Sequence, residues 1–408
     1  MAGALSHIRV LDLTRVLAGP WCTQNLADLG ADVIKIERPG MGDDTRQWGP
    51  PWVPDGNGAA TTDSTYYTST NRNKRSVTID ISKPEGQALV REMVAKCDVL
   101  VENYKVGDLK RYGLGYEDLQ PLNPRLIYCS VTGYGQNGPY ADRPGYDFVF
   151  QGEGGLMSIT GERDDSPGGG PIKVGIAVTD ILTGLYATIG ITAALESRNI
   201  TGKGQYIDAA LLDTIVAFGA NQIADHFMSG NIPKRWGNAH PNMVPYQVFK
   251  TANGHVIVAC GNDGQFQKLC GLMNRPELAA DPELQTVPLR NNSRVRVVAE
   301  IQKTFLTQTS EYWLDGLAKA GVPHGPINNY KQVFAHPQVV ARKLRVDIPG
   351  HKAGGSIPVV ASPLRLSDTP VTYRLPPPVL GEHTNEVLGE ILNKSAAEID
   401  ALKAKKIV

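Results

Sequence analysis

The chain has 408 residues, of which 41% are hydrophobic and 20% are charged, which is enough sequence for one large and one smaller domain, each with its own core. Its 41 lysine and arginine residues balance its 41 aspartate and glutamate residues, and no basic stripe alternates with aromatic residues. The charge pattern therefore argues against a nucleic-acid or membrane-surface partner, and an anionic ligand would have to be bound by local groups.

The five cysteines are odd in number and widely scattered, with no CxxC pair and no histidine at metal-ligand spacing. We therefore expect reduced, buried thiols, no metal site and a cytoplasmic location. The first residues lack the features of a signal or transit peptide. No run approaches about 18 uninterrupted apolar residues, so we expect no membrane span.

Apolar runs rich in branched residues alternate with helical segments through the first part of the chain. The predicted strands are 7–16, 31–37, 76–81, 98–102 and 125–131. The predicted helices between them are 21–29 and 84–96, the second beginning with proline. This alternation predicts an α/β fold with a doubly wound parallel sheet that is covered on both faces.

The pattern changes after a loop at 152–171 that is rich in glycine, serine, aspartate and proline. We expect a buried helix at 176–196 and a second helical stretch at 209–228. The later predicted elements are strands at 246–250 and 255–260 around an Asn253-Gly254 hairpin turn, an extended segment at 350–358, and a terminal helix at 384–392.

Residues 133–138 match GxGxxG after a predicted strand, but the following Pro139 and Pro144 do not allow a helix to begin as a dinucleotide site requires. We interpret the match as a flexible loop. The backbone N–H groups of this loop and of 152–155 are candidates for stabilising an oxyanion.

Asp180 lies in the apolar segment 174–184, VGIAVTDILTG. A carboxylate in this setting either caps the helix that follows or serves as a functional acid with tuned solvation. As a functional acid, it either removes a proton or attacks a carbonyl group to form an acyl-carboxylate anhydride. The residues alone leave these alternatives open.

Several cations and amides fall at or just past predicted strand ends, where open α/β sheets bind their ligands. Converging cations suit a phosphate-rich ligand, although charged surface loops produce the same pattern. These residues are Arg38, Arg75, Asn103, Lys105, Arg111 and Arg143. His240, in a turn-rich segment, fits a structural or a catalytic role.

At these segments the chain resembles the class III CoA-transferases (CaiB/BaiF type), a family that also contains α-methylacyl-CoA racemases. The matching stretches follow one another in order at 10–20, 31–46, 71–76, 101–103, 130–138 and 174–184. The resemblance implies that Asp180 forms an acyl-aspartyl anhydride, that coenzyme A or acyl-CoA is a substrate, and that no cofactor is permanently bound. It also implies CoA contacts at Leu17, Ala18, Arg38, Ile79, Ser82, Asn103, Tyr104, Lys105, Arg111, Arg143, Tyr146 and Asp147.

Two departures from the family pattern argue against a racemase and against an enzyme that acts on formyl-CoA. Racemases carry a histidine before the aspartate of the last stretch, whereas this chain has Tyr146 before Asp147. Relatives that act on formyl-CoA carry a glycine-rich loop where this chain has residues 240–242. Segments 234–237, 244–250, 325–329 and 376–381 resemble the branch that moves CoA from succinyl-CoA to glutarate and related dicarboxylates.

We therefore expect an acyl-CoA donor, a carboxylic acid acceptor, and a cation for the distal carboxylate, with Arg15, Arg235 and His240 as candidates. The resemblance further implies an interlocked homodimer and a large domain formed by both termini. The expected parts are a large domain at 1–210, a helical linker at 211–237, a small α+β domain at 238–330 and a return segment at 331–408. The alternatives are an acyl-CoA racemase or isomerase, a CoA-transferase for another acid, and a non-catalytic acyl-CoA-binding protein.

Overall fold

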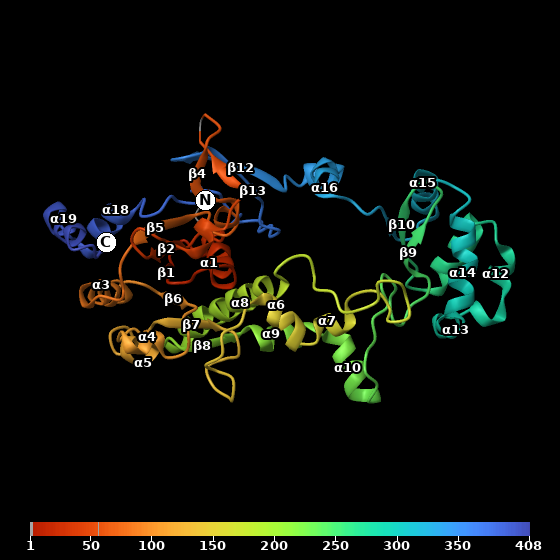
Figure 1. Cartoon of the computed structure of the whole chain (residues 1–408), viewed down its shortest axis with the longest axis horizontal. Coiled ribbons are helices and arrows are strands. Elements are labelled where there is room, and N and C mark those ends of the chain that lie inside the picture. The colour runs from red at the N-terminus through yellow and green to blue at the C-terminus, as the bar shows by residue number, and fades with distance from the viewer. Residues whose placement is uncertain (1–2, 56) are drawn as a thin grey trace. The chain divides into compact units, whose positions relative to one another are not determined.

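The computed structural model describes residues 3–55 and 57–408, which form two compact units (Figure 1). The first unit comprises the described residues of Met1–Leu156 together with Lys173–Met228 and Val340–Val408. The second comprises Met157–Ile172 and Ser229–Val339. The domain boundaries expected from the sequence stay a prediction.

The first unit is built on a six-stranded sheet with the order β5-β2-β1-β6-β7-β8. Every strand pairing in this sheet is parallel, so the predicted α/β fold with a large parallel sheet is confirmed. The strands are β1 (Arg9–Asp12), β2 (Asp32–Glu37), β5 (Lys74–Thr78), β6 (Val99–Glu102), β7 (Ile127–Thr132) and β8 (Tyr206–Ala210).

Helices cover the sheet on both faces. Successive side chains of a strand point to opposite faces, so neighbouring residues of one strand belong to two different cores. In β1, Val10 belongs to a core with α1 (Ala18–Asp28) and α8 (Val178–Thr201). The next residue, Leu11, belongs to a core with α3 (Pro84–Val94) and α18 (Thr384–Leu392). All five cysteines are buried and free, as predicted.

The first unit also contains shorter elements around the sheet. Its one-turn and short helices are η1 (Asp44–Gln47), α2 (Thr65–Thr68), α4 (Asp108–Arg111), α5 (Tyr116–Leu119) and α6 (Asp147–Glu153). Its small sheets pair β3 (Trp52–Pro54) with β4 (Ala60–Ser64), and β12 (Arg345–His351) with β13 (Gly355–Val360).

Several sequence-based boundaries were wrong. The stretch 209–228 is not one helix: β8 ends at Ala210, and α9 (Leu211–Phe218) and α10 (Ala220–Ser229) follow, interrupted at Gly219. The predicted loop 152–171 contains α7 (Leu156–Ile159). The chain also continues past α18 into α19 (Ala396–Ala404), which the prediction lacked.

The second unit contains the predicted hairpin of β9 (Tyr246–Lys250) and β10 (His255–Ala259), whose turn is closed by the Thr251 N–H group donating to the Gly254 carbonyl. A short strand, β11 (His324–Gly325), pairs with β10. The helices are α11 (Asp263–Leu272), α12 (Pro276–Ala280), η2 (Pro282–Leu284), α13 (Val287–Asn292), α14 (Arg294–Phe305), α15 (Ser310–Ala320) and α16 (Tyr330–Ala335), and α17 (Pro337–Ala341) leads back to the first unit.

One helix in the described part of the chain, α8, is long and apolar enough to cross a membrane by those two measures. A single such helix is weak evidence, because core helices of soluble proteins have the same length and composition. Within the first unit α8 packs along α1. A Cβ atom at Gly184 would lie 2.5 Å from the Ala18 carbonyl oxygen, so glycine allows this close approach.

Candidate active site

Asp180 is the third residue of α8, and only 9% of its surface is exposed. Burial raises the pKa of its carboxyl group to about 7, and the nearby carboxylate of Asp147 adds to the shift. Among the described residues, no hydrogen bond or ion pair reaches the Asp180 carboxylate. Buried carboxylates with a structural role are normally bonded, so this side chain fits a reactive group.

The capping alternative for Asp180 is wrong, because α8 begins at Val178 and its N-cap residue is Ala177. The side chain that serves this helix end is that of Asp147, from α6. Its Oδ1 atom accepts a hydrogen bond from the Thr179 N–H group at 2.8 Å, and its Oδ2 atom accepts one from the Gln151 side chain at 2.7 Å. Asp147 is therefore fixed next to Asp180.

Tyr66, on α2, is a further neighbour of Asp180 that the sequence analysis missed. Burial raises the pKa of its phenol group to about 12, and the Asp180 and Asp147 carboxylates contribute to this shift. Trp48 packs edge-on against Tyr66, with ring centroids 5.2 Å apart. The one available signal was a group of aromatic residues within a polar, irregular stretch, which no periodicity marked as an element.

A pocket of about 370 Å³ lies where β1 and β2 end, and it collects several of the residues expected to contact CoA. Arg38, Ile79, Ser82 and Tyr104 all line it. Arg15, a candidate for the acceptor, lines it too and pairs with Asp44 at 2.9 Å in an ion pair that is well exposed. The pocket therefore offers two arginines at the edge that the sequence predicted for a ligand.

The other expected CoA contacts lie outside the lining of this pocket. Asn103 is bonded to the backbone of Arg15, Arg111 pairs with Asp108, and Arg143 lies over the ring of Tyr140. The remaining residues occupy the ends of helices or a neighbouring pocket: Leu17 (N-cap of α1), Ala18 (first residue of α1), Tyr146 (N-cap of α6), Asp147 (first residue of α6) and Lys105.

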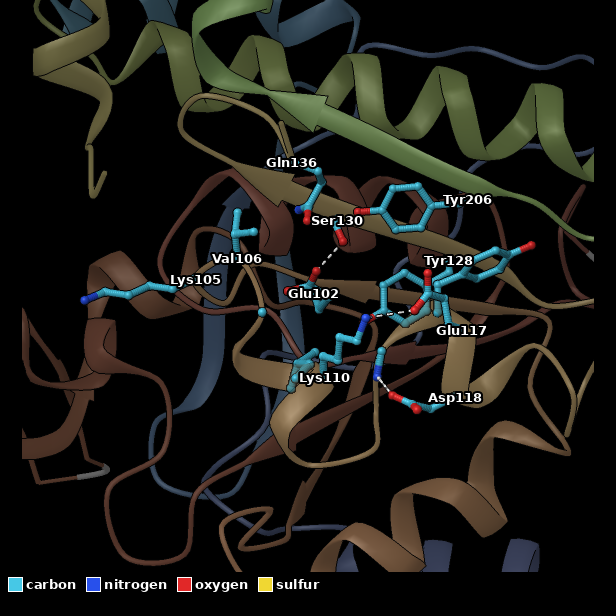
Figure 2. A pocket seen from close by; sticks show the side chains of 14 residues that line it. Glu102, Lys105, Val106, Lys110, Glu117, Asp118, Tyr128, Ser130, Gln136 and Tyr206 are labelled. Atoms are coloured by element: carbon cyan, nitrogen blue, oxygen red, sulfur yellow. Dashed lines mark hydrogen bonds and ion pairs between the residues drawn. The ribbon is translucent and has the colours of Figure 1, made fainter. Parts of the chain in front are cut away.

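The neighbouring pocket, of about 420 Å³, is shown in Figure 2. Lys105 lines it together with Glu102, which no pattern had indicated. The Ser130 hydroxyl and the Tyr104 N–H group both donate to the Glu102 carboxylate. Burial nevertheless raises the pKa of Glu102 to about 7. Unlike Asp180, this acid is bonded on both oxygens.

The glycine-containing loops proposed for oxyanion stabilisation use several of their N–H groups internally. Gly135 donates to the Thr132 hydroxyl and Gln136 to the Asp208 carboxylate. Gly154 and Gly155 donate to carbonyl groups of their own helical turn. These four N–H groups are already bonded in this structure.

Arg235 and His240 both lie in the second unit. Arg235 donates to the Asp164 carboxylate and to the carbonyl of Ser158, so its guanidinium is already engaged. His240 accepts a hydrogen bond from the Asn242 N–H group on Nδ1 at 3.0 Å. Its pKa is lowered by burial and by the charge of Arg294.

Arg294 was missed by the sequence analysis. Its guanidinium lies over the Trp236 ring, 4.5 Å from the centroid, and donates to the carbonyls of His240 and Pro241. Among the described residues it has no carboxylate partner, whereas Arg235 has one. Arg294 therefore keeps donors for an external anion.

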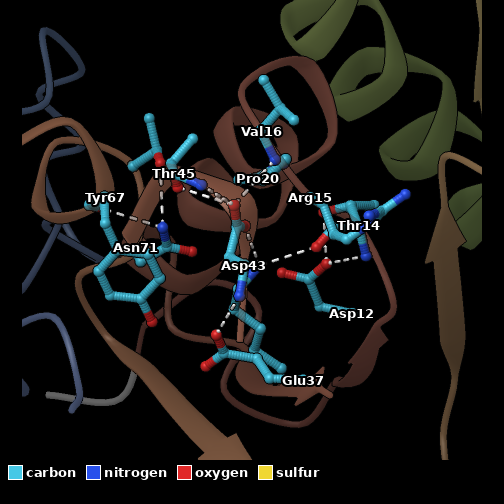
Figure 3. Close-up of polar contacts among 12 residues, drawn as sticks. Asp12, Thr14, Arg15, Val16, Pro20, Glu37, Asp43, Thr45, Tyr67 and Asn71 are labelled. Carbon is cyan, nitrogen blue, oxygen red and sulfur yellow. Dashed lines mark hydrogen bonds and ion pairs between the residues drawn. The ribbon is translucent and has the colours of Figure 1, made fainter. Parts of the chain in front are cut away.

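Two buried ion pairs adjoin the 370 Å³ pocket, and Figure 3 labels their acidic members, Asp12 and Asp43. Lys74 pairs with Asp12 at 3.1 Å and Lys35 pairs with Asp43 at 2.9 Å, and all four side chains are fully buried. Asp12 and Lys35 lie within predicted buried strands and were the signal for these pairs, because a buried charge requires a partner.

Comparison with known proteins gives one consistent result. The model of CoA-transferase family III matches residues 5–384. A succinate–glutarate CoA-transferase of Agrobacterium fabrum is 50% identical over 391 residues, covering 95% of each chain. The human succinyl-CoA:glutarate CoA-transferase is 44% identical over 404 residues, covering 99% of this chain and 90% of the human one. A solved CAIB/BAIF family protein from Brucella suis, 46% identical, has a TM-score of 0.84 and covers 96% of this chain and 100% of its own.

Proposed function

Because this chain belongs to CoA-transferase family III and is a CoA-transferase, we propose that it moves CoA from succinyl-CoA to a short dicarboxylate such as glutarate. The names of the two relatives support both substrates. The residues at 240–242 and Tyr146 argue against a formyl-CoA enzyme and a racemase, as set out from the sequence. A transferase for another carboxylic acid is the alternative.

The observation that carries the mechanism is the buried, unbonded carboxylate of Asp180. A carboxylate that accepts no hydrogen bond from the protein is a stronger nucleophile than a hydrogen-bonded one, because attack costs it few hydrogen bonds. We assign it the role of temporary acyl carrier.

The proposed reaction has four steps, and Asp180 is restored at the end. The ionised carboxylate attacks the thioester carbonyl of the donor, which forms a mixed anhydride and expels CoA thiolate. The thiolate attacks the aspartyl carbonyl, releasing the donor acid and leaving an aspartyl thioester. The acceptor carboxylate attacks this thioester and expels the thiolate again, which then attacks the acyl carbonyl of the second anhydride to give the new acyl-CoA.

Both anhydrides hydrolyse in water, so the mechanism requires a dry site. The 9% exposure of Asp180 and its apolar neighbours Val178, Ile181 and Leu182 support this requirement. The raised pKa has the same origin, because burial is its largest cause.

A dicarboxylate acceptor requires a cation for the carboxylate that does not react. The sequence offered Arg15, Arg235 and His240 for this role, and of these Arg15 belongs to the same unit as Asp180. The Arg15 guanidinium is held by an exposed ion pair with Asp44, which costs little to break, and lies 5.4 Å from the centroid of the Tyr104 ring. Arg235 would have to break its ion pair with Asp164 before it could bind the carboxylate of the acceptor.

The test is a panel of short mono- and dicarboxylic acids offered with succinyl-CoA, with the products identified by mass. We expect glutaryl-CoA as a product. The rate of CoA transfer to dicarboxylates should exceed that to monocarboxylates of equal length by about tenfold or more, because a cation that binds the second carboxylate contributes at least that factor. A protein that binds CoA but exchanges no label between succinate and succinyl-CoA would be a binding protein. Deuterium uptake at the substrate α-carbon without an acceptor would identify a racemase.

We also propose that the protein is a homodimer. The helices α6, α8 and α9 pack on one another within the first unit and still expose large apolar side chains, among them Phe148 at 57% and Ile189 at 60%. Such a patch is unusual for a monomer in water. Light scattering should give twice the 44.1-kDa chain mass, and the mass of a single chain would contradict the proposal.

A further inference from the structure

The segment that joins β1 to α1 contains a strained residue. Val16 has a φ angle of +72°, in the left-handed region that β-branched side chains rarely adopt. It is followed by Leu17, the N-cap residue of α1. Such strain persists only where the surrounding structure imposes it.

The surroundings hold this segment by its backbone on three consecutive residues, Thr14, Arg15 and Val16, which Figure 3 labels together with Asp43. The Thr14 carbonyl accepts a hydrogen bond from the Lys35 ammonium group at 2.8 Å. The Arg15 N–H and carbonyl groups are both bonded to the side-chain amide of Asn103, at 2.9 and 2.7 Å. The Val16 N–H group donates to Oδ1 of Asp43 at 3.2 Å.

Asp43 is itself rigidly held. Its Oδ2 atom accepts from Lys35 at 2.9 Å, and its Oδ1 atom also accepts from the N–H and hydroxyl groups of Thr45. Its own N–H group donates to the Glu37 carboxylate at 2.9 Å. Both members of the Asp43–Lys35 pair are fully buried, so Asp43 has no alternative partner in water.

The segment also connects the two parts of the candidate site. Thr14, Arg15 and Asp43 line the 370 Å³ pocket. At its other end, the segment begins α1, whose Ala18 carbonyl faces Gly184 of α8, one helical turn after Asp180. A change at Val16 would therefore move the pocket wall and the helix beside Asp180 together.

We propose that Asp43 is a positioning residue for CoA transfer: by bonding the Val16 N–H group, it holds Val16 in the left-handed conformation that sets Arg15 at the pocket and the start of α1 against α8. This inference rests on the proposed role of Asp180. Asp43 contacts no reacting atom and acts through residue 16.

The test removes the bond without leaving a buried unpaired charge. In the double variant Lys35→Met/Asp43→Ala we expect kcat to fall by about 10²-fold, the cost of a displacement near 1 Å at a reacting centre. Adding Val16→Gly should restore kcat to within about tenfold of wild type, because glycine adopts positive φ without help. Val16→Gly alone should leave kcat near wild type.

The matched control is Lys35→Met/Asp43→Asn, which keeps an oxygen that accepts from Val16 but removes the charges. It should retain most of the wild-type kcat, and a loss as large as that of the alanine variant would overturn the inference. An alanine variant with wild-type kcat, or a folded triple variant that stays inactive, would also overturn it. If the alanine variant does not fold, the triple variant and the asparagine control decide. Asp180→Asn, assayed in parallel, separates the two ideas: an active Asp180→Asn enzyme would refute the proposed nucleophile, whereas the alanine variant and its rescue by Val16→Gly test the role of Asp43.

Discussion

Replacing Asp180 by asparagine should lower the rate of CoA transfer by a factor on the order of 10⁴ or more, because an amide does not form the anhydride. Asparagine has nearly the same shape, and the site is 9% exposed, so packing is preserved. The measurement is the rate of glutaryl-CoA formation from succinyl-CoA, with the affinity for free CoA measured on the same protein. CoA affinity should stay close to wild type.

A chemical control accompanies this variant. The wild-type enzyme is treated with hydroxylamine or borohydride during turnover, and the modified peptide is identified by mass. Label at residue 180 in the wild type and its loss in the asparagine variant are expected. Label on another side chain, or turnover of Asp180→Asn near the wild-type rate, would refute the acyl-carrier role.

The same carboxyl group should set the pH dependence. Its pKa is raised to about 7, and only the ionised form attacks, so kcat/KM should rise with pH up to about 7 and level off above it. Asp147→Asn keeps an oxygen for the Thr179 N–H group but removes a negative charge beside Asp180. The rise should therefore move to lower pH, without returning to 3.8, because burial is the larger cause.

Arg46→Met should cost about 3–5 kcal/mol of unfolding free energy, the usual cost of removing one partner from a buried ion pair. The Arg46 side chain is 4% exposed and bonds Glu37 at 2.8 Å and Asp63 at 2.6 Å. Its guanidinium also lies 3.7 Å from the ring centroid of Tyr67. Methionine would leave two buried carboxylates without their cation, and urea unfolding of the purified protein measures the loss.

Arg345→Met is the matched control, because Arg345 forms an ion pair with Asp347 whose two side chains are 62% and 53% exposed. Water screens this pair, so the expected change is about 0.5 kcal/mol or less. Equal effects of the two substitutions would show that burial does not decide the strength of these pairs.

The large sheet was predictable because its strands are nearly continuous apolar runs and its helices have clear starts. The predicted helix at 84–96 begins at Pro84, as the structure has it. The strand β8 was not predictable in the same way: its sequence, YIDAA, is not a continuous apolar run, and helix α9 begins directly after it, so 209–228 reads as one helical stretch. Tertiary pairing with β7 decides its conformation.

In the candidate site too, a residue was predictable only where a local sequence pattern marked it. Arg38 and Tyr104 follow strand ends, and the structure brings them to one pocket. Tyr66 and Arg294 come from segments whose partners lie far away in the sequence, so no local pattern marked them. The left-handed Val16 was equally hidden, because valine gives no sign of positive φ and its backbone partner, Asp43, lies 27 residues away in the sequence.

The buried cysteines affect how this enzyme handles its own substrate. Burial raises the pKa of Cys22, Cys97 and Cys260 to about 12, and that of Cys129 is raised as well. A thiol of this kind is almost wholly protonated at neutral pH and exchanges slowly with disulfides. Because all five cysteines of the described chain are buried, we expect coenzyme A released during turnover, and its oxidised dimer, to leave them unmodified.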